Sequence, residues 1–263
     1  MIFASDLDRT LIYSQRALED YPAEDNLDLV SVERKLEKDI SFMTSKSLEY
    51  LQEIATKLLF VPVTTRSLAQ FQRVSFHDIS FPYVITTNGA NILYKDKPLA
   101  EWNEMVKTGL NELSIGVNEL SILLNKYLQK INGDIRVVED LFVYFHLREM
   151  IAPTFVKELS DFMKEKGWKV SLQGRKLYFV PTIVSKGRAL KYIQEREEET
   201  TLIGAGDSLF DDDFLQHCQF PFVLGHGELA AMDTIKPHYK IIEPVGVKGG
   251  EELLRKILKL IEI

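Results

Sequence analysis

Three acidic side chains and several hydroxyl or amide side chains stand where apolar runs of this sequence end, and a fourth acid follows shortly after the last of them. Crowding carboxylates together is costly, because like charges repel and burial disfavours the ionised form. Taken alone, Asp6 and Asp8 fit a charged surface turn as well as a site whose chemistry needs two carboxylates. The residues at the run ends are Asp6, Asp8, Thr64, Thr65, Asn88 and Asp207, with Asp211 shortly after Asp207.

The types of these residues favour a magnesium site that binds phosphate. Several carboxylates in one place need a counter-charge, and oxygen ligands without a cluster of His or Cys favour Mg²⁺ over Zn²⁺. Mg²⁺ held by a few carboxylates completes its shell with water and phosphate oxygens. Lys186 is the candidate side-chain cation, and we expect Lys186 and Thr64 to hold the remaining phosphate oxygens.

The elements that must position these residues alternate between strands and helices. Short runs that are apolar throughout, separated by amphipathic stretches, indicate a parallel sheet covered by helices on both faces. Ligands of such a sheet bind at the carboxyl ends of its strands, and the residues above stand at those ends. The predicted strands lie in residues 1–5, 58–65, 81–90, 200–208 and 220–225.

The middle of the chain has a different pattern. Paired-strand patterns over 135–149 and 168–182 alternate with predicted helices over 117–131 and 152–167, which indicates an inserted α+β unit. Residues 19–42 form a separate irregular segment near the first strand. It contains a predicted hairpin, and we expect its acidic residues to form a solvated face.

Composition excludes several classes of protein. The chain has 263 residues, is 45% hydrophobic and carries a net charge of −7, which is ordinary for a globular protein and argues against a nucleic-acid binder. No apolar run has the roughly 18–20 residues that a membrane span needs, so we expect no membrane partner. Cys218 is the only cysteine, so it has no disulfide partner within the chain, and a cytoplasmic protein is predicted. We expect the Cys218 side chain to pack in the core.

Four short motifs occur in order along the chain. They are "FASDLDRTL" with Asp6 and Asp8, "VPVTTRS" with Thr64, "VSKGRAL" with Lys186, and "GAGDSLFDDDFL" with Asp207 and Asp211. Together they resemble the motifs of the haloacid dehalogenase (HAD) superfamily of phosphatases. A fifth stretch, "ITTNGANIL" around Asn88, resembles the Asn-Gly segment of the Cof-type, sucrose-phosphatase-like subgroup.

The resemblance implies a fold and a reaction. The fold is α/β, with a Rossmann-like parallel-sheet core over residues 1–90 and 182–263 and an inserted α+β cap of the C2 type, in its C2B form, over 91–181. The implied reaction is Mg²⁺-dependent hydrolysis of a phosphomonoester, with a small phosphorylated metabolite such as a sugar phosphate as substrate. The cap is expected to close over the crevice, exclude water and select the leaving group.

The resemblance also implies a role for each motif residue. Asp6 is the expected nucleophile that forms an aspartyl-phosphate, and Asp8 is the expected general acid and base. Lys186, Thr64 and Thr65 are the expected phosphate-binding residues. The expected metal ligands are Asp6, Asp8 (through its backbone carbonyl), Asp207 and Asp211; the expected substrate-binding residues are Asn88, Arg9 and Arg66.

Two residues depart from the usual family pattern. Arg9 replaces the glycine that is most common between the second Asp and the Thr, and Phe210 replaces an Asn often found before the last acid. Arg9 fits either a contact with a substrate anion or a contact that ties down residues 19–42; a solvated or structurally paired arginine is a further reading. Two alternative functions stay open, namely a phosphomutase on the same scaffold and a catalytically silent protein that binds a phosphorylated ligand.

Overall fold

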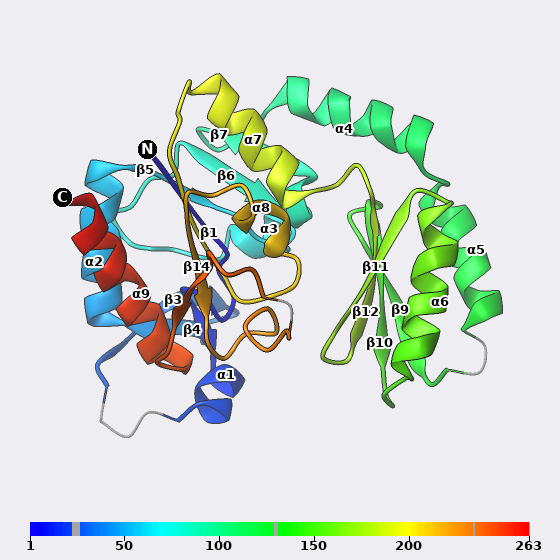
Figure 1. Cartoon of the computed structure of the whole chain (residues 1–263), viewed down its shortest axis with the longest axis horizontal. Helices are drawn as coiled ribbons and strands as arrows, with labels where there is room; N and C mark the ends of the chain where they lie inside the picture. The colour runs from blue at the N-terminus through cyan, green and yellow to red at the C-terminus, as the bar shows by residue number, and fades with distance from the viewer. Residues whose placement is uncertain (23–26, 129–130, 234, 263) are drawn as a thin grey trace. The chain divides into compact units, whose positions relative to one another are not determined.

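The chain forms two compact units (Figure 1). The computed structural model describes residues 1–22, 27–128, 131–233 and 235–262. Unit 1 consists of Met1–Pro98 and Lys186–Ile263, and unit 2 consists of Leu99–Ser185. The boundaries lie a few residues after those expected from the sequence, because the hairpin that follows Asn88 pairs within unit 1. All predicted site residues belong to unit 1.

A five-stranded parallel sheet forms the centre of unit 1. Its strand order is β15-β14-β13-β1-β5, and each neighbouring pair is parallel. The apolar runs predicted as strands form these elements because both faces of the sheet are covered, so every residue of β1 is buried. The strands are β1 (Ile2–Ser5), β5 (Leu59–Pro62), β13 (Leu202–Gly206), β14 (Phe220–Leu224) and β15 (Lys240–Ile242).

A further strand, β6 (Tyr83–Thr86), extends this sheet beside β5. A parallel bridge joins Val63 to Ile85, and the Thr64 amide donates to the Ile85 carbonyl at 2.9 Å. On its other side β6 pairs with β7 (Asn91–Tyr94), which pairs with β8 (Lys97–Pro98) in an antiparallel sheet. Counted in chain order, the parallel strands have the spatial order 3-2-1-4-5-6 of a Rossmann-like fold, so the order reverses between β1 and β13.

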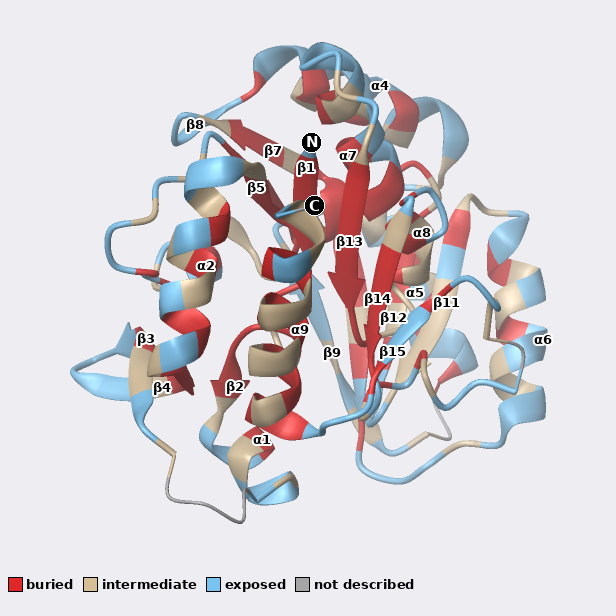
Figure 2. Ribbon diagram, turned by 60° about the vertical axis from the view of Figure 1, so that its left-hand side comes forward, coloured by how far each residue is buried: buried red, intermediate tan, exposed pale blue. Residues whose placement is uncertain are grey.

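Amphipathic helices cover the sheet of unit 1, and Figure 2 shows their buried sides toward the strands. In α2 (Ser45–Lys57) the Thr44 side chain caps the helix by accepting from the Ser47 amide at 3.0 Å. Helix α2 lies beside α9 (Gly246–Ile261) (Figures 1 and 2), and apolar side chains of both enter one core cluster. The other helices of unit 1 are α1 (Gln15–Asp20), α3 (Leu68–Phe71), α7 (Lys186–Arg196), α8 (Asp212–Leu215) and the 3₁₀ turn Thr87–Gly89.

The predicted hairpin after the first strand is present, but the prediction that its acids face solvent is wrong for Glu33. Strands β3 (Leu29–Lys35) and β4 (Lys38–Thr44) pair, and β2 (Tyr13–Ser14) pairs with β4. The Glu33 side chain is only 1% exposed. The register of the hairpin shifts between Ser31 and Glu33, so two consecutive residues, Val32 and Glu33, are both buried. Residues 23–26 of the predicted segment lie outside the described residues.

Unit 2 has the predicted pattern of helices and paired strands. Its antiparallel sheet has the order β11-β12-β10-β9, and α5 and α6 pack against one face through apolar side chains such as Leu124 and Leu159. The opposite face carries Tyr144 and Tyr178, whose rings lie 5.6 Å apart. Residues 129–130 of the predicted helix 117–131 lie outside the described residues. The elements are α4 (Ala100–Leu113), α5 (Val117–Tyr127), β9 (Gly133–Val138), β10 (Phe142–Leu147), α6 (Pro153–Lys164), β11 (Trp168–Gln173) and β12 (Lys176–Pro181).

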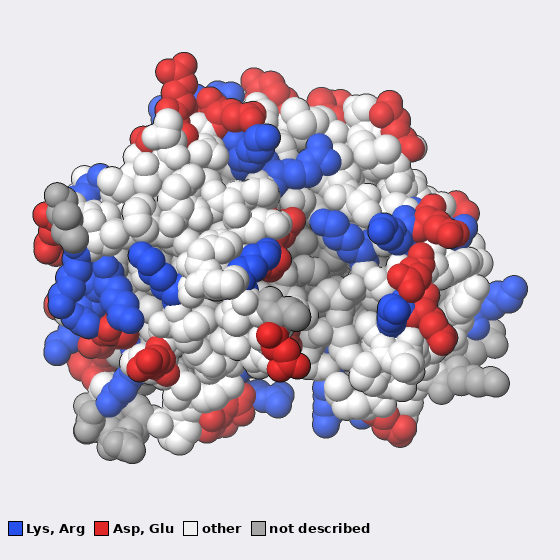
Figure 3. All heavy atoms as spheres, viewed as in Figure 1, with Lys and Arg blue, Asp and Glu red and all other residues white. Residues whose placement is uncertain are grey.

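One face of the protein (Figure 3) and the described helices are ordinary in charge and polarity. Acidic and basic side chains are interspersed on the face drawn in Figure 3. Within the described ranges, every helix is too short or too polar to span a membrane. Cys218 is buried, as expected, and burial raises the pKa of its thiol to about 12.

Candidate active site

Asp6 stands directly after β1, at the point where the strand order reverses. Its amide donates to the Ala205 carbonyl of β13 at 2.9 Å, so the residue continues the ladder between the two central strands. Its carboxylate is buried and accepts from the Lys186 ammonium at 2.7 Å. The sheet therefore presents one carboxylate, with its own counter-charge, at the carboxyl end of its central strand.

Asp211 holds the turn that follows β13. One carboxylate oxygen accepts from the Asp207 amide at 3.0 Å, the Ser208 amide at 2.8 Å and the Ser208 hydroxyl at 2.9 Å. The other oxygen accepts from Lys186 at 2.7 Å. Both oxygens of Asp211 are thus engaged with protein groups, and the turn fixes Asp207 opposite Asp6.

Asp212 and Asp213, which follow Asp211 directly, hydrogen-bond to other segments of the chain. Asp213 accepts from the Gly187 amide at 3.1 Å, at the start of α7, so it stabilises the first turn of the helix that carries Lys186. Asp212 accepts from Lys236 at 2.7 Å and from the Tyr239 hydroxyl. Neither residue joins the cluster around Asp6.

Lys186 is the first residue of α7 and is fully buried. Its ammonium bridges Asp6 and Asp211, each at 2.7 Å. Burial by itself would lower the pKa of Lys186, but the charges of Asp211 and Asp6 more than offset it and raise that pKa. Lys186 is therefore a fixed cation in the site.

Three buried acids converge without enough positive charge to balance them. Oxygen atoms of Asp6, Asp207 and Asp211 all lie within 4.8 Å of one another. Burial and the neighbouring carboxylates raise the pKa of both Asp6 and Asp207. Three carboxylates against the one ammonium of Lys186 are the donor set and the charge deficit that suit a hard divalent cation. The residues present therefore fit a metal ion.

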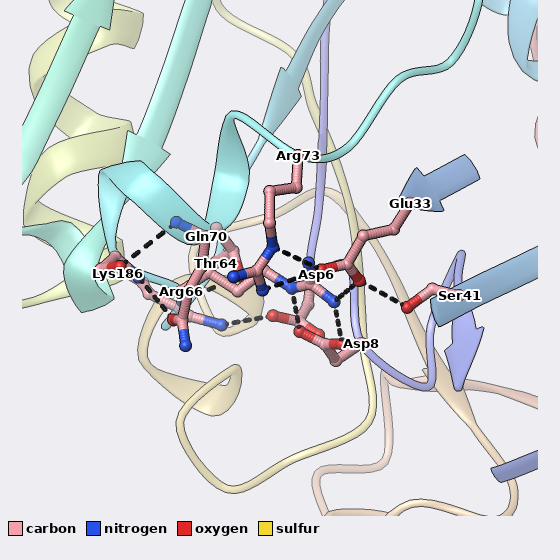
Figure 4. Close-up of polar contacts among 10 residues, drawn as sticks. Asp6, Asp8, Glu33, Ser41, Thr64, Arg66, Gln70, Arg73 and Lys186 are labelled. Carbon is pink, nitrogen blue, oxygen red and sulfur yellow. Dashed lines mark hydrogen bonds and ion pairs between the residues drawn. The ribbon is translucent and has the colours of Figure 1, made fainter. Parts of the chain in front are cut away.

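The carboxylate of Asp8 faces the guanidinium of Arg66 (Figure 4). Its side chain is 47% exposed, and both of its oxygens pair with Arg66, each at 2.7 Å. The same Arg66 donates to the buried Glu33 at 2.9 Å. Of the residues expected to contact metal, Asp8 is the one whose carboxylate is outside the acidic trio.

Thr64 and Asn88 are brought together by a left-handed turn after β6. Thr87, Asn88 and Gly89 all have positive φ values, of 51°, 58° and 98°. Because of this turn, the backbone N–H of Asn88 donates to the Thr64 carbonyl at 3.0 Å. The Thr64 hydroxyl accepts from the backbone N–H of Arg66 at 3.1 Å. Such a conformation is unfavourable for a β-branched residue such as Thr87, and strain of this kind is typical of functional sites.

The side chains of the remaining predicted residues differ in how far they are engaged. The Asn88 Oδ1 atom is buried and has no hydrogen-bond partner within the part of the chain that the structure describes. Thr65 is half-buried beside Thr64. A buried acceptor without a donor is costly, so Asn88 is suited to receive a hydrogen bond from a ligand or from water.

Arg9 has a left-handed backbone and is paired with the segment after it. Its φ is 66°, its guanidinium donates to the Tyr21 hydroxyl at 2.9 Å, and its charge lies over the Tyr21 ring at 5.4 Å from the centroid. The His226 Nε2 atom lies 2.8 Å from the Arg9 carbonyl. Because glycine alone adopts this φ freely, the conformation explains why glycine is common here in the family. Of the contacts considered for Arg9 from the sequence, the structure contains the one with residues 19–42, which Arg9 makes through Tyr21.

The side chains that support these residues were not predicted from the sequence. Glu33 accepts from Arg66, Ser41 and Arg73, and Tyr21 and His226 hold Arg9. No motif marks any of them. An alternating pattern predicts one buried face for β3, and it is the register shift at Val32 that also turns Glu33 inward.

A family model described as "Sucrose-6F-phosphate phosphohydrolase" matches residues 1–233 of the chain.

The chain belongs to this family.

The protein is therefore a phosphatase of the HAD superfamily, as the four motifs predicted. No curated protein matches the sequence.

Solved structures share the fold at low sequence identity. The sucrose-phosphatase from Synechocystis sp. PCC6803, solved in complex with sucrose and phosphate, matches with a TM-score of 0.67 and 16% identity, over 100% of this chain and 98% of that one. A trehalose-6-phosphate phosphatase related protein matches with a TM-score of 0.57 and 16% identity, over 99% and 98% of the two chains. The HAD phosphatase BT1666 from Bacteroides thetaiotaomicron matches with a TM-score of 0.59 and 11% identity, over 99% and 94%.

The predicted fold class is confirmed by these matches together with the parallel sheet of unit 1 and the antiparallel sheet of unit 2. The predicted site residues fall into three groups in the structure. Asp6, Lys186, Asp207 and Asp211 form one buried cluster; Thr64, Thr65 and Asn88 lie on neighbouring turns; Asp8, Arg66 and Arg9 lie on or beside the loop after β1.

Proposed function

We propose that this chain hydrolyses a sugar phosphate in the presence of Mg²⁺, through a phosphorylated Asp6. The observation that carries the proposal is the buried cluster in which Asp6 lies beside Lys186 and within 4.8 Å of the oxygens of Asp207 and Asp211. Mg²⁺ would be held by Asp6 and Asp207, with Asp211 assisting and the Asp8 carbonyl as a further ligand. When bound, it supplies the positive charge that lets an anionic carboxylate and an anionic phosphate meet.

In the first step a carboxylate oxygen of Asp6 attacks phosphorus. A bond forms between phosphorus and that oxygen, and the bond between phosphorus and the leaving-group oxygen breaks. Asp8 donates a proton to the leaving oxygen, so that an alcohol departs and not an alkoxide. Lys186 and Thr64 hold oxygens of the phosphoryl group during the transfer, with Thr65 and Asn88 as further contacts.

In the second step water regenerates the enzyme. Asp8, now a carboxylate, takes a proton from a water molecule, whose oxygen attacks phosphorus. The bond between phosphorus and Asp6 breaks, inorganic phosphate leaves and the carboxylate of Asp6 is restored. Lys186 stays paired with Asp211 throughout and keeps a positive charge beside the reacting carboxylate.

A sugar phosphate is the proposed substrate on two grounds. The matching family is described as a sucrose-6F-phosphate phosphohydrolase family, and one similar structure was solved with sucrose and phosphate bound. Sugar phosphates also have alcohols as leaving groups, which depart slowly without a proton and so need an acid such as Asp8.

The test is phosphate release from a panel of sugar phosphates by the wild type and by Asp6→Asn. The wild type with Mg²⁺ is expected to release inorganic phosphate, and Asp6→Asn is expected to lose at least about a thousandfold in turnover because it lacks the nucleophile. Asp39→Asn, a matched change of an exposed acid, serves as the control. Turnover of Asp6→Asn near the wild-type rate contradicts the mechanism, and an isomerised sugar phosphate without free phosphate indicates a mutase.

A further inference from the structure

A line of charged side chains connects Asp8 to the β3–β4 hairpin (Figure 4). Arg66 pairs with Asp8 through two parallel hydrogen bonds, from Nε to Oδ2 and from a terminal nitrogen to Oδ1, both at 2.7 Å. The same terminal nitrogen donates to Glu33 at 2.9 Å. Two-bond pairs of this kind fix the orientation of both planar groups, so the position of Arg66 determines that of the Asp8 carboxylate.

Glu33 is the anchored member of this line. It is 1% exposed and accepts from Ser41 at 2.7 Å and from Arg73 at 3.0 Å, in addition to Arg66. Its hydrogen bonds with Arg66 and Ser41 lower the pKa of Glu33 despite its burial, so it is an anion at neutral pH. A buried carboxylate held by three donors cannot follow the motions of a loop, whereas Asp8 is half exposed.

Arg66 itself depends on Glu33 for its orientation. Its side chain is 11% exposed, and its charge is shared between two carboxylates, Asp8 and Glu33. Without the second carboxylate, the guanidinium would pair with Asp8 alone. Its orientation would then depend on the half-exposed Asp8 and no longer on a buried, fixed carboxylate.

We infer that Glu33 is a positioning residue for Asp8, acting through Arg66. The inference rests on the proposed function, in which Asp8 donates a proton to the leaving oxygen. Glu33 fixes the plane of the guanidinium, which in turn fixes the orientation of the Asp8 carboxylate. The β3–β4 hairpin is in this way part of the proton-transfer machinery.

The test compares two leaving groups in Glu33→Gln, which keeps the shape of the side chain and removes its charge. An alkyl phosphate needs a proton on its leaving oxygen, whereas 4-nitrophenyl phosphate releases a stable anion without one. The ratio kcat/KM reports the steps up to departure of the leaving group. It is expected to fall at least about tenfold for a sugar phosphate and less than about threefold for 4-nitrophenyl phosphate. An equal loss on both substrates, or no loss on either, overturns the inference.

Asp39→Asn is the matched control. Asp39 lies on the same hairpin, is 44% exposed and pairs with Arg34 at 3.0 Å, so the substitution removes one charge without touching Arg66. Both kcat/KM values are expected to stay at the wild-type level. If Glu33→Gln does not fold, Arg66→Lys replaces it. A lysine keeps the charge but cannot make the two-bond pair, so it is expected to give the same selective loss, and an unselective loss overturns the inference.

A crystal structure of Glu33→Gln separates this inference from the proposed function. If the wild type releases no phosphate from any substrate, the proposed function fails, but the orientation of Asp8 can still be observed. The variant is expected to lose at least one of the two hydrogen bonds between Arg66 and Asp8. A pair that keeps both bonds in the wild-type orientation overturns the inference, whatever the activity.

Discussion

At the scale of single residues, Lys186 and Arg9 are two cations that differ in burial and in backbone strain. Lys186 is fully buried between two carboxylates, and removing it would take away the cation that pairs with both. Arg9 makes a partly exposed contact with Tyr21, but its backbone adopts a conformation that favours glycine. The side chain of Arg9 therefore stabilises the loop after β1 while its backbone destabilises it.

This balance predicts the effect of two substitutions at Arg9. Arg9→Gly loses the contact with Tyr21 but relieves the left-handed backbone, whereas Arg9→Ala loses the same contact and relieves nothing. We expect Arg9→Ala to be less stable than Arg9→Gly by about 1 kcal/mol. Denaturant unfolding of the two variants measures the difference directly. Equal stability of the two would mean that the φ of 66° costs nothing.

The sequence was informative about residues that belong to motifs and silent about those that support them. Asp6, Lys186, Asp207 and Asp211 could be predicted because each stands at a strand or helix end, and such ends meet in a parallel sheet. Glu33 could not be predicted, because its burial depends on a one-residue shift of register within the β3–β4 hairpin. A shift of one residue turns a side chain to the other face of a strand, and no local pattern records it.

At the scale of elements, His226 connects the loop after β1 to the start of α9. Its Nδ1 atom accepts from the Gly246 amide at 3.2 Å, so the other ring nitrogen carries the proton and donates to the Arg9 carbonyl at 2.8 Å. The ring is thus neutral, and burial lowers the pKa of His226. A proton on Nδ1 would break the bond to the first residue of the helix.

This arrangement predicts a loss of stability in mild acid. The unfolded chain takes up a proton at His226 near pH 6.5, whereas the folded chain resists it, so the free energy of unfolding falls as the pH decreases below about 6.5. We expect the melting temperature of the wild type to fall more steeply between pH 7 and 5 than that of His226→Gln. His217→Gln, at an exposed histidine, is the control and should keep the wild-type slope. Identical slopes for all three proteins would contradict the prediction.

At the scale of the whole molecule, the site gathers residues from both chain segments of unit 1. The central strands β1 and β13 contribute Asp6 and Asp207, and the start of α7 contributes Lys186. The motifs predict this convergence, since three of them follow strands of the same sheet and the Lys186 motif opens a helix that packs on it. The same charges that prepare the site for a cation destabilise unit 1 when no cation is bound.

The excess of negative charge at Asp6, Asp207 and Asp211 predicts that Asp207→Asn raises stability without metal and lowers it with metal, relative to the wild type. Asp207→Asn removes one of three crowded carboxylates, so in the presence of a chelator we expect it to be more stable than the wild type, by about 1 kcal/mol. With Mg²⁺ in large excess over its dissociation constant, the wild type should gain about 2–3 kcal/mol and become the more stable protein. Thermal unfolding in both conditions measures the change of order. If Mg²⁺ stabilises both proteins equally, Asp207 is not a metal ligand.

The pairing of β1 with β13 also has a consequence for how the protein is made. Ser5 lies beside Ala205 in the central sheet, so β1 meets this neighbour only after the 200 residues that separate the two (205 − 5) have been translated. At roughly 5–20 residues per second, β1 waits on the order of ten to forty seconds for that partner. During this interval an apolar strand ending in Asp6 is without half of its sheet, while unit 2, whose residues are contiguous, has already emerged in full. The nascent chain therefore depends on β5 and α2 to cover β1 until β13 has been synthesised.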